Sequence, residues 1–310
     1  MNKSKIKRKN KFRAKEDLEL FVLSLPVLIK TLIFAYLPMF GIIIAFKNLN
    51  YSQGIFKSPW VGFKNFEFFF KSDSAWRVTR NTIVMNLVFI VTTLAMGILF
   101  AVLLYKLTRS RRLAKTYQVI MFFPYFLSWV VVAFLLNTLI GPNGSITHMA
   151  KAIGFSGNFY LEASFWPFIL TIVNMWKSAG YNCLLYYSVL MGVDESLYEA
   201  AAIDGASEPQ TIRYIQIPAL IPMVILNVLM AIGNIFRGDF GMFYFLPGTA
   251  NSFTLETTDV IDTFAYRAMK DQANFSLSSA VGVYQSVVGF ILILFSNWLV
   301  KKYDPDRSLF

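Results

Sequence analysis

The sequence predicts an all-α, polytopic membrane protein with six transmembrane helices. Its 310 residues are 56% hydrophobic and only 15% charged, whereas about 25% of the residues of a soluble domain are charged. Six apolar stretches have the length of about 20 residues that crosses a hydrocarbon core as a helix. Alternation of apolar and polar residues, which is typical of membrane β-barrels, is not visible. A helical fold satisfies every backbone hydrogen bond within each span.

The six predicted spans contain no Asp or Glu. Four prolines fall inside them, and we expect these prolines to kink the helices, because neighbouring helices can satisfy the freed backbone groups. The predicted spans are 20–46, 82–106, 117–140, 166–190, 218–236 and 280–300, and the prolines are Pro26, Pro38, Pro124 and Pro222.

Lys and Arg residues are concentrated on one side of the predicted membrane. The side that holds both termini carries 17 of them and the other side carries ten. Cytoplasmic segments are enriched in Lys and Arg. We therefore expect cytoplasmic tails at 1–19 and 301–310, a first helix at 20–46, extracellular loops at 47–81 and 237–279, and a five-helix core over 82–300. The first apolar stretch is too long for a signal-peptide core and lacks a small-residue cleavage site, which predicts a retained anchor.

The predicted cytoplasmic loop 191–217 departs from this charge pattern, because it has five carboxylates against Arg213 alone. Anionic lipid headgroups repel such a loop, so it should face a basic protein surface. Its pattern predicts two short helices: Asp194 caps the first, Gly205 ends it, and Ser207 with Gln210 forms a capping box for the second. A helix of about ten residues is marginal in water by itself, which favours docking into a partner over a merely amphipathic surface loop.

The first of these helices carries a recognisable motif. The run EAAAIDGA, followed by IQIP, resembles the EAA loop of the membrane subunits of ATP-binding-cassette importers. The usual family form ends in Ile-x-Leu-Pro, and many relatives have Trp at the position of Pro209. The resemblance implies a coupling helix that sits in a cleft of a cytosolic ATPase subunit, where Glu199 pairs with a basic group. The residues that match the motif are Glu199, Ala200, Ala201, Asp204, Gly205, Ala206 and Pro218.

The resemblance extends over nearly the whole chain. Further segments look like permeases of the carbohydrate importer group that handles polysaccharide fragments such as aldouronates. These segments are LPVLIKTLIFAYLPMFGIIIAFKNLNYSQGIF, SPWVGFKNFEFFF, the pair Asn81-Thr82, RGDFGMFYFLPG, TDVIDTFAYR and Asn297. The resemblance implies the type I fold of a binding-protein-dependent transport system inner-membrane component, in the bacterial cell membrane with both termini cytoplasmic.

The resemblance also implies partners. These are a second homologous permease subunit, two ATPase subunits that bind ATP-Mg, an extracellular lipid-anchored sugar-binding protein and an oligosaccharide substrate. Neither a cofactor on this chain nor a nucleic acid is expected. Relatives handle aldouronates, pectin fragments, alginate oligomers or glycoprotein glycans, and the sequence leaves the choice among these sugars open.

Polar residues on otherwise apolar helices are candidates for a substrate path, because an unpaired amide or charge in hydrocarbon is costly and usually faces an interior. Asn227 and Asn234 are seven residues apart and so share a helix face. Amides and aromatic rings suit sugars, but they equally suit interhelical hydrogen bonds and an interfacial aromatic belt. Lys177 either contacts an acidic sugar or pairs with carbonyls or a second permease. The path candidates are Asn174, Lys177, Asn227, Asn234, Arg237 and Tyr244.

Other functional classes fit the sequence less well. The chain lacks the phosphate-loop pattern G-x-x-x-x-G-K-[ST], so ATP must act through a partner. The alternative is a self-contained ion-coupled secondary transporter, which would usually carry carboxylates within the membrane. An enzyme would need a catalytic cluster, yet the single histidine, His148, lies outside the spans. One cysteine, Cys183, excludes an intrachain disulfide. Catalytic and metal sites are therefore not expected.

Overall fold

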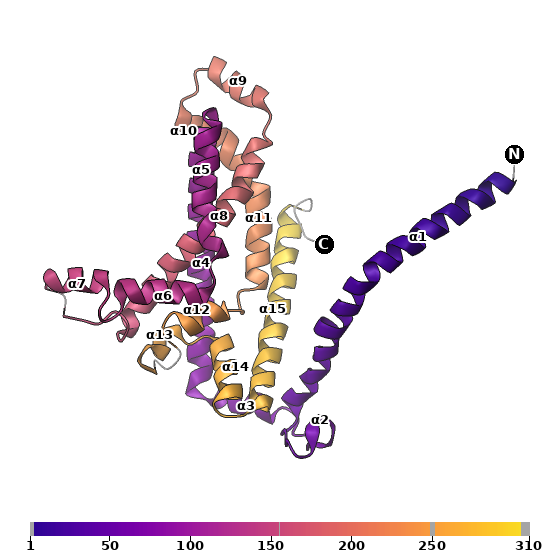
Figure 1. The fold of residues 1–310 in the computed structure, drawn as a ribbon, viewed down its shortest axis with the longest axis vertical. Coiled ribbons are helices and arrows are strands. Elements are labelled where there is room, and N and C mark those ends of the chain that lie inside the picture. Colours follow the sequence, from indigo (N-terminus) through magenta and orange to yellow (C-terminus); the bar gives the residue numbers. More distant parts are fainter. Residues whose placement is uncertain (1–2, 155, 249–251, 305–310) are drawn as a thin grey trace.

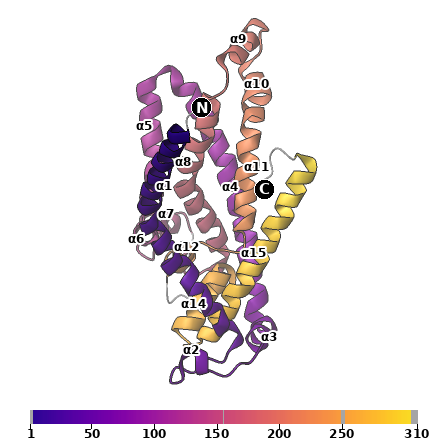
Figure 2. The same ribbon diagram turned by 90° about the vertical axis from the view of Figure 1, so that its right-hand side faces the viewer.

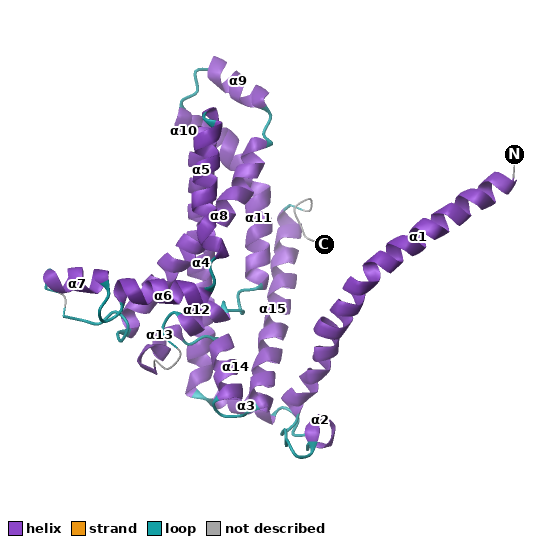
Figure 3. Cartoon of the chain, viewed as in Figure 1, coloured by secondary structure: helices purple, strands orange, loops and turns teal. Residues whose placement is uncertain are grey.

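The computed structural model describes residues 3–154, 156–248 and 252–304. Within these ranges every regular element is a helix, and the one extended pairing is an isolated bridge between Lys47 and Trp60 (Figure 3). The predicted all-α class is therefore confirmed. Four long helices stand side by side as a bundle (Figures 1 and 2), and they are α4 (Asp73–Lys106), α8 (Trp166–Met191), α11 (Ile217–Gly233) and α15 (Phe275–Tyr303).

The centre of the bundle is the pair α4 and α8, which form the most extensive helix–helix contact among the described residues. Two glycines allow the close approach of neighbouring backbones. A Cβ on Gly97 would lie 2.7 Å from the Cβ of Asn182, and a Cβ on Gly180 would lie 1.8 Å from the carbonyl oxygen of Met121 in α5 (Arg111–Phe122). Small residues at such crossings allow the dense packing that holds membrane helices together.

The first predicted span lies in a long helical rod whose α1 part stands away from the bundle (Figure 1), while its last part, Leu37–Phe46, packs against α15 (Phe275–Tyr303). It begins as α1 (Lys3–Thr31), continues through a π-helical turn (Leu32–Tyr36) and ends as a 3₁₀ helix (Leu37–Phe46). None of the residues in its most apolar window is buried. A helix that is apolar and exposed on all sides requires an apolar surrounding, either lipid or another protein.

The third predicted span, 117–140, is wrong as a single helix. The chain leaves α5 at Phe122, makes a 3₁₀ turn (Phe123–Phe126) and starts α6 (Trp129–Ile140) after the N-cap Ser128. Helix α6 then runs across the bundle rather than along it (Figure 1). Pro124 was expected to kink this span, but it lies in a complete break.

Five described segments are long and apolar enough to cross a membrane, namely Asp17–Phe46, Asp73–Lys106, Trp129–Ala152, Glu208–Gly233 and Phe275–Lys302. Helix α8 is not among them, because Lys177 and several amides lower its hydropathy. Its 26 residues nevertheless extend for about 39 Å at a rise of about 1.5 Å per residue. It therefore fills the fourth predicted span by length.

Short helices gather at the two ends of the bundle (Figure 1). At one end, called here the α9 end, lie α9 (Glu195–Ile203), α10 (Glu208–Thr211) and a π-helical turn (Ile212–Gln216) that leads into α11. Toward the other end, called the α3 end, lie α2 (Gly54–Lys57), α3 (Lys64–Lys71), α12 (Phe240–Phe245), α13 (Leu255–Thr258) and α14 (Ile261–Lys270). Helix α7 (Ser145–Ala152) follows α6 at the side.

A buried carboxylate fixes the α3 end. Asp259 is fully buried, and its Oδ2 accepts from Arg267 at 2.6 Å and from Arg77 at 3.3 Å. The Asn81 amide donates to the Asp259 carbonyl at 3.1 Å, and the Thr82 hydroxyl accepts from the Ile261 N–H at 3.0 Å. The first half of α4 is therefore tied to the segment that leads into α14.

Candidate functional site

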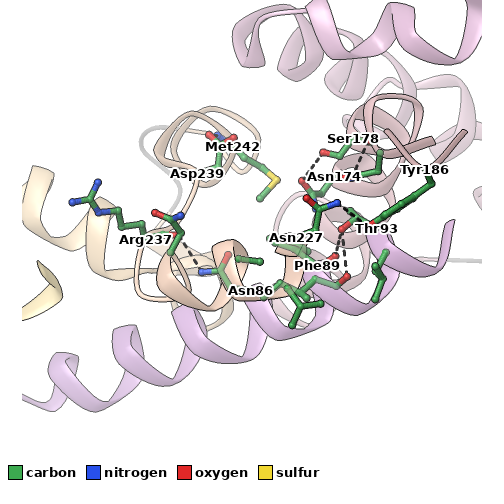
Figure 4. Close-up of a pocket in the computed structure, with 16 residues that line it drawn as sticks. Asn86, Phe89, Thr93, Asn174, Ser178, Tyr186, Asn227, Arg237, Asp239 and Met242 are labelled. Atoms are coloured by element: carbon green, nitrogen blue, oxygen red, sulfur yellow. Dashed lines mark hydrogen bonds between the residues drawn. The ribbon is translucent and has the colours of Figure 1, made fainter. Parts of the chain in front are cut away.

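A cavity of about 330 Å³ lies between α4, α8, α11 and the start of α12 (Figure 4). Its apolar lining includes Phe89 and Met242, and its polar lining is dominated by side-chain amides. The polar groups are contributed by Asn86, Thr93, Asn174, Ser178, Asn182, Tyr186, Asn227, Asn234, Arg237 and Asp239. Each primary amide has both donors and an acceptor. Such a lining is suited to a ligand with many hydroxyl groups.

Hydrogen bonds across the cavity hold several of these groups in place. The Asn227 amide on α11 donates to the hydroxyl of Tyr186 on α8 at 3.0 Å. On α8, the Ser178 hydroxyl donates to the amide oxygen of Asn174 at 3.4 Å. Figure 4 shows these side chains converging from separate helices. The cavity wall is thus a connected polar surface rather than a set of isolated residues.

The end of α11 is closed by a side chain from α4. The Asn86 amide donates to the carbonyls of Ile235 at 2.8 Å and Arg237 at 3.2 Å, beyond the last turn of the helix. Arg237 is among the residues that line the cavity, and its exposed side chain points away from the other lining side chains (Figure 4). Its cation therefore lies at the rim of the cavity.

The start of α12 is fixed by Asp239. One carboxylate oxygen accepts from the indole N–H of Trp129 at 2.7 Å, and the other accepts from the N–H of Met242 at 3.3 Å as an N-cap. A Cβ on Gly241 would lie 2.6 Å from the Trp129 ring. Helix α12 is therefore packed directly against α6 and held in one orientation.

Lys177 does not line this cavity. Its side chain is buried and its ammonium faces the break between α5 and α6, where it donates to the carbonyls of Tyr125 and Leu127, both at 2.7 Å, and of Pro124 at 3.4 Å. The ammonium also lies 5.1 Å from the Trp129 ring centroid. The Pro124 carbonyl also accepts from the N–H of Leu127 at 3.2 Å within the turn. The Lys177 ammonium donates to carbonyls at a point where the chain leaves the helical pattern.

Tyr244 also lies outside the cavity. Its ring stacks on Phe240 with centroids 4.9 Å apart, and its hydroxyl is 3.0 Å from the ammonium of Lys270 on α14. It belongs to an aromatic cluster on the far side of α12.

The structure therefore brings four of the six path candidates into one cavity: Asn174, Asn227, Asn234 and Arg237. Sequence reasoning missed other residues of the lining, which are Asn86, Thr93, Ser178, Asn182 and Tyr186. These residues meet the criterion that selected Asn227, which is a polar side chain within an apolar helix. The sequence prediction took candidates only from the fourth and fifth predicted spans and the residues that follow the fifth.

At the α9 end, the caps predicted from the sequence are present. The Asp194 carboxylate accepts from the N–H of Ser196 at 3.0 Å, and this hydrogen bond lowers the pKa of Asp194. Gly205 has φ of +72°, so only a glycine fits there without strain. The Ser207 N–H donates to the side chain of Gln210 at 2.7 Å in a capping box.

Most of the matched motif is open to solvent. Glu199 and Ala200 are exposed on α9, and Ala201 is half-buried; of the residues after it, Asp204, Gly205 and Pro218 are exposed and Ala206 is half-buried. Glu195 and Ile203 are four residues from Glu199, so these three share a helix face. Ile203 is 86% exposed. This face combines two carboxylates with an exposed apolar side chain, which is typical of a docking surface.

The loop is attached to the end of α4. The Tyr198 ring stacks on Tyr105 with centroids 5.5 Å apart and an interplanar angle of 27°, and burial raises the pKa of Tyr198. Lys106, the last residue of α4, forms an ion pair with Glu208 on α10. Because the preceding half of α4 carries Asn86, the cavity and the α9 end are joined by one continuous helix.

The fold and these two features define a polytopic membrane transport subunit. Residues 93–305 match the family of binding-protein-dependent transport system inner membrane components. The chain is 32% identical to Protein LplB of Bacillus subtilis (strain 168) over 94% of this chain and 91% of that protein. It is also 32% identical to the polygalacturonan/rhamnogalacturonan transport system permease protein YteP of the same organism, over 93% and 89% of the two chains.

A solved structure shows the same fold. A chain of a bacterial ABC transporter involved in the import of the acidic polysaccharide alginate superposes with a TM-score of 0.84 and 30% identity, over 96% of this chain and 99% of that chain. The chain belongs to the family of binding-protein-dependent transport system inner membrane components. It is accordingly a non-catalytic membrane subunit of an ABC importer.

Proposed function

We propose that the chain is the permease subunit of an ATP-driven importer for fragments of acidic polysaccharides. The observation that carries this proposal is the polar cavity joined through α4 to the exposed face of α9. Two similar proteins support this cargo class. One is a polygalacturonan/rhamnogalacturonan transport system permease, and the other belongs to a transporter involved in the import of alginate. The exposed Arg237 at the cavity edge suits such a cargo, because it can pair with a sugar carboxylate.

In this proposal, the α9 end and both termini face the cytoplasm. Two ATPase subunits that bind ATP-Mg dock there, and the α3 end receives an extracellular, lipid-anchored sugar-binding protein. A second homologous permease completes the pair in the bacterial cell membrane. The distribution of Lys and Arg along the sequence supports this orientation.

Coupling follows from rigid connections. Helix α4 has 34 residues and therefore extends for about 51 Å at a rise of about 1.5 Å per residue. A displacement of α9 by the ATPase is passed to Tyr105 through its stacked partner Tyr198. The same helix carries Asn86 and Thr93 into the cavity. Moving α4 against α8 and α11 would alternately open and close the cavity toward the two sides.

The rival class is a self-contained ion-coupled secondary transporter. Such a protein binds its coupling ion through intramembrane carboxylates. Among the residues that line the cavity, Asp239 is the one carboxylate, and its two oxygens accept from Trp129 and Met242. The cavity therefore favours an importer that is driven from outside the chain.

Purification of the tagged chain from its own cells in mild detergent, followed by mass spectrometry, tests the proposal. We expect recovery of a second permease and an ATP-binding subunit. Glu199→Lys should lose the ATPase subunit and keep the second permease, because the site is an exposed contact. The matched pair is Glu199→Gln and Glu67→Gln, which make the same charge change at opposite ends of the molecule, and only the first should weaken ATPase recovery. Recovery of the chain alone, active without ATP, would contradict the proposal.

A further inference from the structure

Helix α12 has two faces with different surroundings. On one face, Met242 and Phe243 are buried, and the Phe243 ring lies 6.0 Å from the ring of Phe89 beside the cavity. On another face, Phe240 and Tyr244 stand four residues apart and therefore point the same way. This second face is not required for the contact with the cavity.

Helix α14 presents a matching pair to this face. Tyr266 and Lys270 are also four residues apart, so they share one side of α14. The Tyr266 ring lies 4.9 Å from the ring of Phe240 and 5.1 Å from that of Tyr244. The Lys270 ammonium lies 5.5 Å from the centroid of Tyr266 and 5.8 Å from that of Tyr244. Three rings and one cation from two helices thus form a single group, which we call the α12–α14 platform.

Another aromatic group at this end has a ring in the core. Phe69, which packs against the partly buried Phe264 and Tyr284, is 1% exposed. In contrast, Phe240, Tyr244 and Tyr266 are each only partly buried, and Lys270 is exposed. Rings that served only as packing would gain more from complete burial.

The chemistry of the platform fits one class of ligand. An ammonium has three N–H donors, and the Tyr244 hydroxyl is its one hydrogen-bond partner among the described residues. Donors therefore remain for a carboxylate, while the adjacent rings can cover the apolar face of a sugar ring. Asp239 fixes α12 through Trp129, so the platform sits beside the cavity in a set position.

We infer that the α12–α14 platform is a second sugar-binding site, separate from the cavity, which contacts one uronate residue of an acidic oligosaccharide through Lys270 and the rings of Tyr244 and Tyr266. The inference rests on the proposed function, since it places a binding site for the imported sugar on the side where the sugar would enter. Arg237 at the rim of the cavity then offers a second cation further along the path.

Equilibrium binding to the complete transporter in lipid nanodiscs, without the sugar-binding protein, tests the inference. The probes are trigalacturonate and an alginate trisaccharide, each compared with its methyl ester, which keeps the shape and removes the charge. We expect the acids to bind about fivefold more tightly than the esters. Lys270→Gln, made and compared in an Arg237→Gln background so that the other cation does not contribute, should reduce this preference to within about twofold, because the charge-assisted hydrogen bond of Lys270 is lost. Tyr266→Ala should weaken acid and ester alike.

The matched control is Lys71→Gln, since Lys71 is an exposed lysine at the same end whose ammonium pairs with Glu67 at 2.6 Å. It should keep the full preference for the acids. A preference that survives Lys270→Gln, or equal binding of acid and ester by the unaltered transporter, would overturn the inference. Absence of binding by either probe would overturn it too. ATP-driven sugar uptake, measured after the same purified transporter is placed in proteoliposomes, reports on the proposed function separately.

Discussion

Replacement of Lys177 by methionine should destabilise the protein without changing which sugars it selects. Methionine keeps an unbranched apolar stem, one atom shorter, but leaves the carbonyls of Tyr125 and Leu127 without the donor at 2.7 Å. A hydrogen bond to a charged donor contributes about 1.5–3 kcal/mol. Two such bonds would give about 3–6 kcal/mol, but interhelical bonds in membrane proteins average about 0.6 kcal/mol. We therefore expect a loss of about 2–4 kcal/mol.

The protein contains its own probe for this measurement. Cys183 is the single cysteine and is 1% exposed, so a thiol-reactive dye reports the temperature at which the bundle opens. At about 2 °C per kcal/mol for a chain of this size, the midpoint should fall by about 4–8 °C. Lys30→Met removes an exposed ammonium from the first predicted span and should leave the midpoint unchanged. A normal midpoint for Lys177→Met, combined with a loss of preference for acidic sugars, would refute the structural role.

Three further predictions follow from packing, burial and coupling. Gly180→Ala should lower the same midpoint by several degrees, because its Cβ would lie 1.8 Å from the backbone oxygen of Met121, whereas Gly282→Ala, with open space around it, should not. Burial raises the pKa of Asp262, so the folded state binds the carboxyl proton more tightly than the unfolded state; as the pH falls toward the usual Asp pKa of about 4, the unaltered protein should gain stability relative to Asp262→Asn, and an identical pH dependence of the two midpoints would contradict this. Tyr198→Ala should raise the ATP hydrolysed per sugar imported, while Tyr198→Phe, which keeps the ring, should not; unchanged stoichiometry in the alanine variant would exclude the stacked pair from coupling.

The sequence predicted best what depends on neighbouring residues. Asp194 and Gly205 occupy the cap positions that their side chains dictate, because a cap involves backbone groups only a few residues away. The partner of Lys177 was left open among three kinds of group, since its acceptors are carbonyls about fifty residues earlier in the chain. Pro124 predicted a kink, but the complete break also involves the carbonyls of Tyr125 and Leu127, which accept from Lys177 on the distant helix α8.

The cavity was predictable in part for the same reason. Asn227 and Asn234 were selected by their shared helix face, and both line the cavity. Asn86 comes from a different span and meets them only through the packing of α4 beside α11, which no local pattern shows. Tyr244 was selected with them because it follows soon after in the sequence, yet the turn at Asp239 directs it to the other side of α12.

Sugar uptake into proteoliposomes tests the central claim most directly. The vesicles would contain the purified transporter, with the sugar-binding protein and labelled acidic oligosaccharides outside and ATP supplied inside or withheld. The account predicts uptake that requires internal ATP, continues after ion gradients are collapsed, and is abolished by Glu199→Lys. Uptake that proceeds without ATP and stops when an ion gradient is removed would contradict the account and establish the ion-coupled alternative.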